Sequence, residues 1–307
     1  MTRAIVPALL ALSILPDLFA QQTPVFRGSV DLVNLAATVT DRKGNLVGDL
    51  TMEDFEVYED GRKQNVRFFA SGDPGGAAPE MHLGLTLDVS ESMGEDMSFT
   101  KTAAVKFLNR LLEAVDVTII DFDTEVRVTR YSQSDFARLI ERIRQQKAGG
   151  WTALYDAIGV YLDGAASQSG RKIMVLYTDG GDTRSSISFG ELIDLLKASD
   201  ATVYVIGELE HQPSSLKNDQ RLKLQQIADL TGGKAFFPLT VKELDQIYEQ
   251  VLAEIHAQYL LGYVSANDRT DGTWRKVEIK VRSGAADAHQ YHVRARRGYF
   301  APFRASK

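Results

Sequence analysis

The pattern of hydrophobic and polar residues changes twice along the chain. Over residues 30–70, short stretches of alternating apolar and polar residues are separated by turn residues, which is typical of antiparallel strands. Over residues 81–256, apolar strands alternate with segments of helical spacing. Strict alternation returns at 277–281 and 291–295. The pattern therefore predicts an α/β region between two groups of strands.

The middle region carries the clearest individual elements. Residues 173–177 form a nearly continuous apolar run, as expected for a strand that helices cover on both faces. Apolar residues recur at helical spacing over 105–115 and, most regularly, over 244–255. Strands that alternate with helices in this way predict an α/β fold with a doubly wound, mostly parallel sheet of the Rossmann-like type.

The strands at the two ends of the chain predict one small sandwich. Residues 55–58 and 66–68 flank Asp60-Gly61, which indicates a hairpin because glycine tolerates positive φ. Two or three strands are marginally stable alone, so the two ends are predicted to pack together as a β-sandwich. The predicted segments are a signal peptide (1–20), an N-terminal β segment (25–72), the α/β domain (79–256) and a C-terminal β segment (257–303).

The first twenty residues have the layout of a secretory signal peptide. Arg3 supplies a positive start, residues 5–14 are almost entirely apolar, and Pro16 and Ala20 follow. The apolar run is too short for a membrane-spanning helix, and no other segment approaches that length. We therefore expect an exported protein, periplasmic or secreted, with no membrane span in the mature chain. A packed or disordered N-terminus is the alternative.

The net charge and the cysteine content indicate which partners and which cellular compartment to expect. The net charge of −6 argues against a phosphate-binding surface, and the three clustered arginines Arg294, Arg296 and Arg297 are too few to reverse this. We therefore expect no nucleic-acid partner. The 307 residues include no cysteine, which rules out disulfides and thiolate metal sites. A cysteine-free exported domain is more typical of a bacterium than of a eukaryote.

Polar residues gather where a predicted strand ends. Asp88, Ser90 and Ser92 follow the apolar strand 83–87 at every second position, and residues two apart in an extended chain point the same way. The carboxyl end of a strand is also where open α/β sheets bind their ligands. Oxygen donors of this kind suit a hard cation, Mg²⁺ above all, with Ca²⁺ and Mn²⁺ as alternatives.

Two further residues supply oxygen atoms at other strand ends. Thr152 follows the glycine turn Gly149-Gly150, which opens a helix. Asp179 follows the strand 173–177, and a carboxylate at the tip of a buried strand is costly unless a positive charge lies near it. A shared metal ion supplies that charge. The predicted metal ligands are Asp88, Ser90, Ser92, Thr152 and Asp179.

The Asp-x-Ser-x-Ser segment, the threonine and the Asp-Gly pair together resemble the metal-ion-dependent adhesion site of von Willebrand factor A and integrin inserted domains. All five positions match in order and on the expected elements, over about residues 81–256. The flanking segments LVGDLTMEDFEVYEDGRKQNVRFF (46–69) and RARRGYF (294–300) resemble bacterial von Willebrand factor A-related proteins of unknown role.

The resemblance implies a role for each of these residues. Ser90, Ser92 and Thr152 are expected to contact the metal directly or nearly so, whereas Asp88 and Asp179 are expected to act partly through bound water. Neutral hydroxyl ligands leave the cation able to accept another anionic oxygen, so a Glu or Asp side chain of a partner protein fits the open position. The resemblance thus implies metal-dependent protein binding or adhesion rather than enzymatic activity.

Two other functions would use the same residues differently. One is a metal-assisted hydrolase, but Ser92 lacks the Gly-x-Ser-x-Gly setting of a nucleophile, and Ser90 stands where a phosphotransferase has its second carboxylate. The other is an assembly scaffold that works through the β-sandwich and has a dispensable metal site. Trp151 fits either the binding surface or the core, and Asp182 fits either the rim of the site or a solvated loop.

Overall fold

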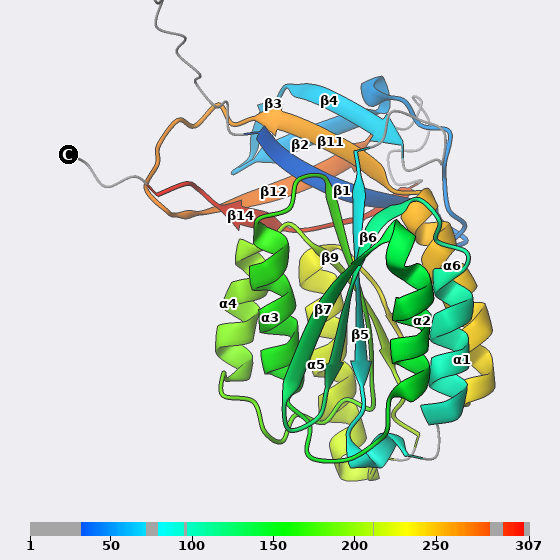
Figure 1. The fold of residues 1–307 in the computed structure, drawn as a ribbon. Coiled ribbons are helices and arrows are strands. Elements are labelled where there is room, and N and C mark those ends of the chain that lie inside the picture. Colours follow the sequence, from blue (N-terminus) through cyan, green and yellow to red (C-terminus); the bar gives the residue numbers. More distant parts are fainter. Residues whose placement is uncertain (1–31, 72–78, 95–96, 211, 283–290, 304–307) are drawn as a thin grey trace, which may run out of the picture. The chain divides into compact units, whose positions relative to one another are not determined.

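A six-stranded sheet, in the order β10-β9-β8-β5-β6-β7, lies at the centre of the α/β region (Figure 1). Its strands are β5 (Met81–Asp88), β6 (Ala114–Phe122), β7 (Val126–Ser132), β8 (Arg171–Thr178), β9 (Thr202–Gly207) and β10 (Ala235–Phe236). Neighbouring strands pair in parallel except β6 and β7, which are antiparallel. The doubly wound, mostly parallel sheet predicted from the sequence is confirmed, whereas the edge strand β7 was not predicted.

The structure is a computed structural model and describes residues 32–71, 79–94, 97–210, 212–282 and 291–303. The predicted signal peptide, residues 1–20, lies outside the described residues. Within the described ranges, no helix combines the length and the apolar character needed to cross a bilayer. The division of the chain into four segments, from the signal peptide to the C-terminal β segment, stays a prediction.

Helices cover both faces of the central sheet. One face packs against α1, α2 and α6 and the other against α3, α4 and α5, and each face has its own hydrophobic core (Figure 1). The helices are α1 (Met97–Leu108), α2 (Phe136–Gln145), α3 (Leu154–Ala166), α4 (Phe189–Ala198), α5 (Ser214–Thr231) and α6 (Leu244–His256), with short 3-10 turns η1 (Met52–Asp54), η2 (Glu91–Met93), η3 (Gln133–Asp135) and η4 (Val241–Glu243). Side chains of a strand alternate between the two faces of the sheet, and helices cover both faces. β8 is therefore buried along its whole length, as its apolar run predicted.

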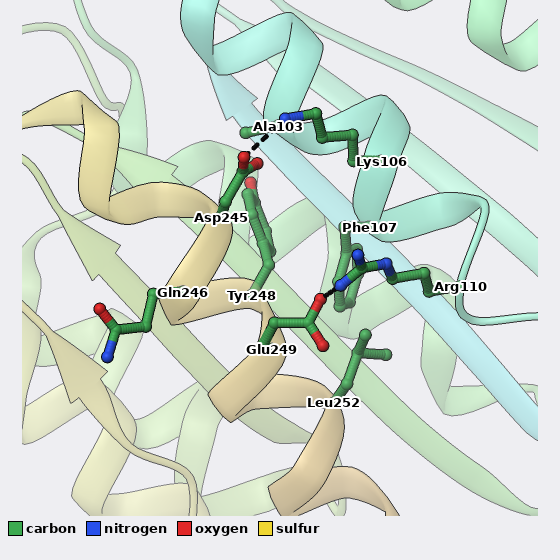
Figure 2. A pocket seen from close by; sticks show the side chains of 9 residues that line it. All are labelled: Ala103, Lys106, Phe107, Arg110, Asp245, Gln246, Tyr248, Glu249 and Leu252. Carbon is green, nitrogen blue, oxygen red and sulfur yellow. Dashed lines mark hydrogen bonds and ion pairs between the residues drawn. The ribbon is translucent and has the colours of Figure 1, made fainter.

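The apolar stripe predicted over 244–255 is confirmed, because α6 buries it against the sheet and against α1. Figure 2 shows this contact, in which the rings of Phe107 and Tyr248 lie 4.8 Å apart between centroids. Lys106 and Asp245 form an ion pair of 2.5 Å at its edge. Both side chains are about half exposed, so this pair contributes roughly 0–1 kcal/mol, and apolar packing sets the position of α6.

The helix predicted over 105–115 is wrong in its second half. α1 ends at Leu108, and β6 begins six residues later at Ala114. Leu112 is 63% exposed and Val115 is 37% exposed. The helical spacing of apolar residues continues past the end of the helix, but the alternation of the following strand turns Val115 outward.

Strands from the two ends of the chain combine in two antiparallel sheets, β13-β1-β11-β4 and β14-β12-β2-β3. Their bounds are β1 (Leu32–Asp41), β2 (Phe55–Glu59), β3 (Arg62–Gln64), β4 (Val66–Ser71), β11 (Tyr259–Val264), β12 (Trp274–Val281), β13 (Tyr291–Ala295) and β14 (Gly298–Phe300). The two sheets share one hydrophobic core, which contains side chains from both ends of the chain. The predicted β-sandwich of terminal strands is therefore confirmed.

The hairpin turn at Asp60-Gly61 is confirmed, but its second strand was predicted wrongly. Both residues have positive φ, +47° and +79°, and they join β2 to the short strand β3. The predicted partner, residues 66–68, belongs to β4, which pairs with β11 in the other sheet. β3 consists of polar residues, so it has no apolar alternation that could reveal it.

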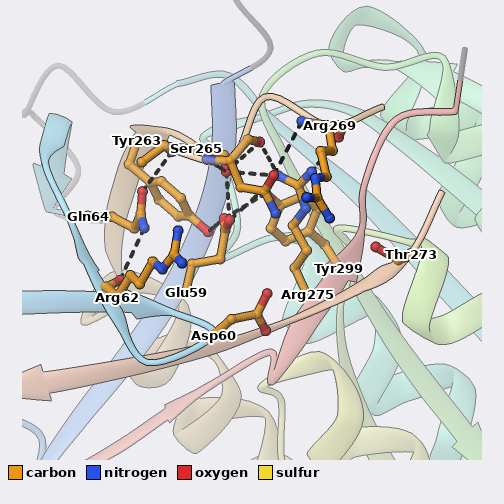
Figure 3. Close-up of polar contacts among 12 residues, drawn as sticks. Glu59, Asp60, Arg62, Gln64, Tyr263, Ser265, Arg269, Thr273, Arg275 and Tyr299 are labelled. Atoms are coloured by element: carbon orange, nitrogen blue, oxygen red, sulfur yellow. Dashed lines mark hydrogen bonds and ion pairs between the residues drawn. The ribbon is translucent and has the colours of Figure 1, made fainter. Parts of the chain in front are cut away.

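A buried polar cluster joins the two ends of the chain inside the sandwich (Figure 3). Glu59, at the end of β2, accepts hydrogen bonds from Tyr263 (2.8 Å), Tyr299 (2.7 Å) and Ser265 (2.6 Å). These donors come from β11, β14 and the segment that follows β11. Burial and the neighbouring Glu59 carboxylate both raise the pKa of Tyr263. One carboxylate thus connects the N-terminal hairpin with three C-terminal segments.

Arg275 of β12 supplies the positive charge of this cluster. Its Nη1 lies 3.5 Å from Oε1 of Glu59, and both side chains are only 2% exposed. The guanidinium also donates to the backbone carbonyls of Asn267 (2.6 Å) and Arg269, so it holds the loop that follows β11. A buried charge pair of this kind is sensitive to the loss of either partner.

Two of the three clustered arginines make internal contacts. Arg294 donates to the carbonyl of Gly232 (3.2 Å) and pairs with Glu254 of α6. Arg296 donates to the carbonyls of Ser199 (3.4 Å) and Asn34 (2.8 Å). The RARRGYF segment therefore attaches the last strands of the sandwich to the α/β region.

Replacing Glu59 by alanine is expected to lower the free energy of unfolding by about 3–5 kcal/mol, because Arg275 is left buried without its carboxylate and two tyrosine hydroxyls lose their acceptor. Urea unfolding followed by circular dichroism measures this loss. Glu278→Ala on the neighbouring strand is the matched control. Its carboxylate is half exposed and pairs with the equally exposed Lys280 at 3.5 Å, so the change should stay within about 0.5 kcal/mol. Equal losses in the two variants would contradict a structural role for the cluster.

Candidate metal centre

Two buried carboxylates lie at the carboxyl ends of the adjacent strands β5 and β8. Asp88 is the last residue of β5 and is fully buried, and Asp179 directly follows β8 and is nearly so. Burial, and then the charge of Asp179, raise the pKa of Asp88 to about 7. Burial also raises the pKa of Asp179. The carboxylate of Asp88 therefore lies close enough to Asp179 to be sensitive to its charge.

The serines of the Asp-x-Ser-x-Ser segment lie against these carboxylates. The backbone N–H and the hydroxyl of Ser90 both donate to Oδ1 of Asp88, at 2.9 and 2.6 Å. The Oγ atoms of Ser90 and Ser92 lie 3.2 Å apart, within η2 and its N-terminal cap. The side chain of Ser92 in turn hydrogen-bonds Asp179. The structure thus brings four of the five predicted ligands together.

Thr152 lies on the neighbouring loop and is buried. The N–H of Gly149 donates to the carbonyl of Val89 (2.9 Å), and the N–H of Glu91 donates to the carbonyl of Gly150 (3.2 Å), so this loop lies along the Asp88–Ser92 segment. In the described part of the chain, no hydrogen bond links the Thr152 hydroxyl to the other four side chains. The backbone hydrogen bonds of its loop nevertheless place Thr152 next to the Asp88–Ser92 segment.

The loop after Asp179 is bound to the loop that carries Thr152. The carbonyl of Thr152 accepts from the N–H groups of Thr183 (2.9 Å) and Arg184 (3.0 Å). Asp182 accepts from the N–H of Tyr155 (3.2 Å) and from the hydroxyl of Ser185 (2.5 Å). Asp182, a half-buried loop residue, thus links the loop after Asp179 to the start of α3 (Leu154–Ala166), and its role at the rim of the site stays a prediction.

Two residues near the acidic pair were not predicted. Thr178 donates its hydroxyl to Oδ2 of Asp88 (2.7 Å) and accepts from the N–H of Gly180 (3.1 Å). A polar residue at the end of an otherwise apolar strand was the available signal for it. The side chain of Gln212 hydrogen-bonds Asp179. No sequence signal could have identified Gln212, because only the path of the loop after β9 brings it there.

Trp151 is 65% exposed, so its placement in the core is wrong. The backbone N–H of Trp151 donates to the hydroxyl of Thr124 (2.9 Å), and the ring, in the residue next to Thr152, lies at the surface.

The donor set determines which ligand the site can hold. No cluster of three or more His, Cys, Asp or Glu side chains suited to a metal occurs among the described residues, so carboxylates alone do not form the site. Two buried carboxylates with adjacent hydroxyls present only oxygen donors, which are the ligands of hard divalent cations. A cation between Asp88 and Asp179 would also offset the cost of burying two like charges. The residues present therefore fit Mg²⁺ and similar ions.

Comparison with known proteins identifies the α/β region. Residues 83–250, more than half of the chain, match the von Willebrand factor type A domain. Among proteins of curated function, nothing matches the chain. Among solved structures, it is similar to a von Willebrand factor type A protein from Catenulispora acidiphila, with 15% identity, a TM-score of 0.51, and coverage of 82% of this chain and 74% of that one.

Two pilus proteins are also similar at low identity. They are the PilB minor pilin from Streptococcus sanguinis (14% identity, TM-score 0.49, covering 60% of this chain and 63% of that one) and the pilus adhesin SpaC from Lactobacillus rhamnosus GG (11% identity, TM-score 0.49, covering 81% and 48%). At these identities, a likeness between structures concerns the fold alone.

Replacing Thr178 by valine is expected to cost about 1–3 kcal/mol of stability, because the buried carboxylate of Asp88 loses a donor and the N–H of Gly180 loses its acceptor. Thermal and urea unfolding measure the loss. Thr86→Val, two residues before Asp88, is the matched control. Its buried hydroxyl has no partner within the described residues, so the same substitution there should be neutral or slightly stabilising. The prediction is wrong if both variants lose the same stability.

Proposed function

This chain belongs to the von Willebrand factor type A family, and on that premise we propose that it is an exported protein-binding module that works through a divalent cation. The cation, Mg²⁺ in the first place, accepts a Glu or Asp side chain of a partner protein. Its role is binding rather than catalysis. The proposed ligands are the predicted ones: Asp88, Ser90, Ser92, Thr152 and Asp179.

The observation that supports this proposal most strongly is the contact between the buried acidic pair and the two serines. Because the hydroxyl of Ser90 donates its proton to Asp88, the lone pairs of its oxygen stay free for a cation. In the same way, the side chain of Ser92 hydrogen-bonds the second carboxylate, that of Asp179. The carboxylates thereby orient neutral hydroxyl ligands and supply negative charge beside them.

The choice of partner follows from the charge of these ligands. In this proposal Ser90, Ser92 and Thr152 are the direct ligands, and the two aspartates act partly through bound water. The hydroxyl oxygens carry no formal charge, so the cation would remain attractive to one more anionic oxygen in direct contact. Ser92 is exposed, which leaves this side of the site open to a partner. A carboxylate is the anionic oxygen donor that proteins offer. Export is supported by the signal-peptide pattern of residues 1–20.

Addition of Mg²⁺ is expected to raise the melting temperature of the unmodified chain. At about 100 times its dissociation constant, a ligand that binds only the folded state stabilises it by about 2.7 kcal/mol, which corresponds to several degrees. The double variant Asp88→Ala with Asp179→Ala should lose this increment. Differential scanning calorimetry with MgCl₂ and with EDTA measures both.

Asp116→Ala separates metal binding from general destabilisation. Asp116 lies near the start of β6, at the opposite end of the sheet, where it pairs with His82 at 3.0 Å. Its loss should lower the melting temperature but leave the Mg²⁺ increment intact. A melting temperature that Mg²⁺ does not change, or an increment that survives the double variant, would contradict the proposal. Turnover of a phosphate ester that depends on Asp88 would contradict a binding role.

A further inference from the structure

We infer that the partner presents its acidic residue between apolar side chains. Trp151, which directly precedes the proposed ligand Thr152, is exposed, and so is Leu216, which lies in sequence between two residues that contact Asp179 or the turn after it. This inference rests on the proposed function and adds the chemistry of the segment that is bound. The partner is a protein segment with a central Glu or Asp.

Trp151 would form one side of the rim of the metal centre. It lies between Gly150, whose φ is +78°, and the proposed ligand Thr152. A Cβ on Gly150 would lie 2.7 Å from the Thr124 hydroxyl, the same group that accepts the N–H of Trp151. The backbone is therefore held closely while 65% of the side chain is exposed. A large aromatic side chain on a held loop loses little conformational entropy when a partner covers it.

Leu216 would form the other side of the rim. It belongs to the first turn of α5 and is 50% exposed. Gln220, one turn later on the same face of the helix, contacts the turn that follows Asp179, since a Cβ on Gly181 would lie 3.3 Å from its Nε2. Gln212, just before this helix, hydrogen-bonds Asp179. Leu216 therefore lies on the side of Asp179, whereas Trp151 lies on the side of Thr152.

The charges around the rim favour the same partner. The exposed residue Arg184 donates its N–H to the carbonyl of Thr152, which brings a basic residue to the loop beside the site. A basic residue and a divalent cation both favour an acidic side chain. Exposed tryptophan beside a polar centre is the kind of side chain that dominates binding energy at protein interfaces. An acidic residue would suit the cation and Arg184, and its apolar neighbours would suit Trp151 and Leu216.

Short capped peptides with a central Glu test the inference, with either Leu or Ser on both sides of it. Binding of the full chain is measured with MgCl₂ present, by the change in tryptophan fluorescence and by calorimetry. Burial of leucine against Trp151 and Leu216 should make the Leu-flanked peptide bind about tenfold more tightly than the Ser-flanked one. A peptide with Gln in place of Glu should bind neither strongly nor in a Mg²⁺-dependent way.

Trp151→Ala should remove the preference for Leu while keeping the rise in melting temperature with Mg²⁺, which shows that the variant is folded and holds the metal. Leu112→Ala is the matched control, because Leu112 is 63% exposed but precedes β6 at the opposite end of the sheet. It should keep the preference. Equal binding of the two peptides, or a preference that survives Trp151→Ala, overturns the inference alone. Absence of any Mg²⁺ effect on melting and on peptide binding overturns the proposed function, and the inference with it.

Discussion

Burial of two adjacent strands on both faces is the constraint on which the α/β region depends. β5 and β8 lie side by side in the middle of the sheet, and helices on each face leave nearly all of their side chains without access to water. Strands in this position must be largely apolar, so their charged side chains gather where the strands end. Asp88 and Asp179 occupy two such ends at the same edge of the sheet. The location of the candidate metal centre follows from how the sheet is covered.

The electrostatics of the site follow from the same burial. A carboxylate without access to water is destabilised, and a second one nearby adds to the cost, which is why the pKa of Asp88 rises to about 7. Ser90 and Thr178 oppose this by donating hydrogen bonds to its two oxygens. These bonds hold the side chain in one orientation. The centre therefore combines a fixed geometry with negative charge that a cation would offset.

The sandwich depends on both ends of the chain, because neither end could form a stable sheet alone. Apolar strands from both ends share one core, and the charge pair of Glu59 and Arg275 lies inside it (Figure 3). The arginines of RARRGYF then attach this sandwich to the α/β region through backbone carbonyls. Two of the three clustered arginines, Arg294 and Arg296, therefore have a structural role.

The sequence by itself determined the features that depend on local spacing. These are the alternation of strands and helices, the buried stripe of α6, the turn at Asp60-Gly61, and the order of the five oxygen-bearing residues along the chain. Contacts between distant residues decided the rest. The early end of α1 and the polar strand β3 have no periodic signal of their own, and Thr178 and Gln212 join the site only through folding. Only the tertiary structure placed Trp151 at the surface, because exposure depends on what the rest of the chain leaves uncovered.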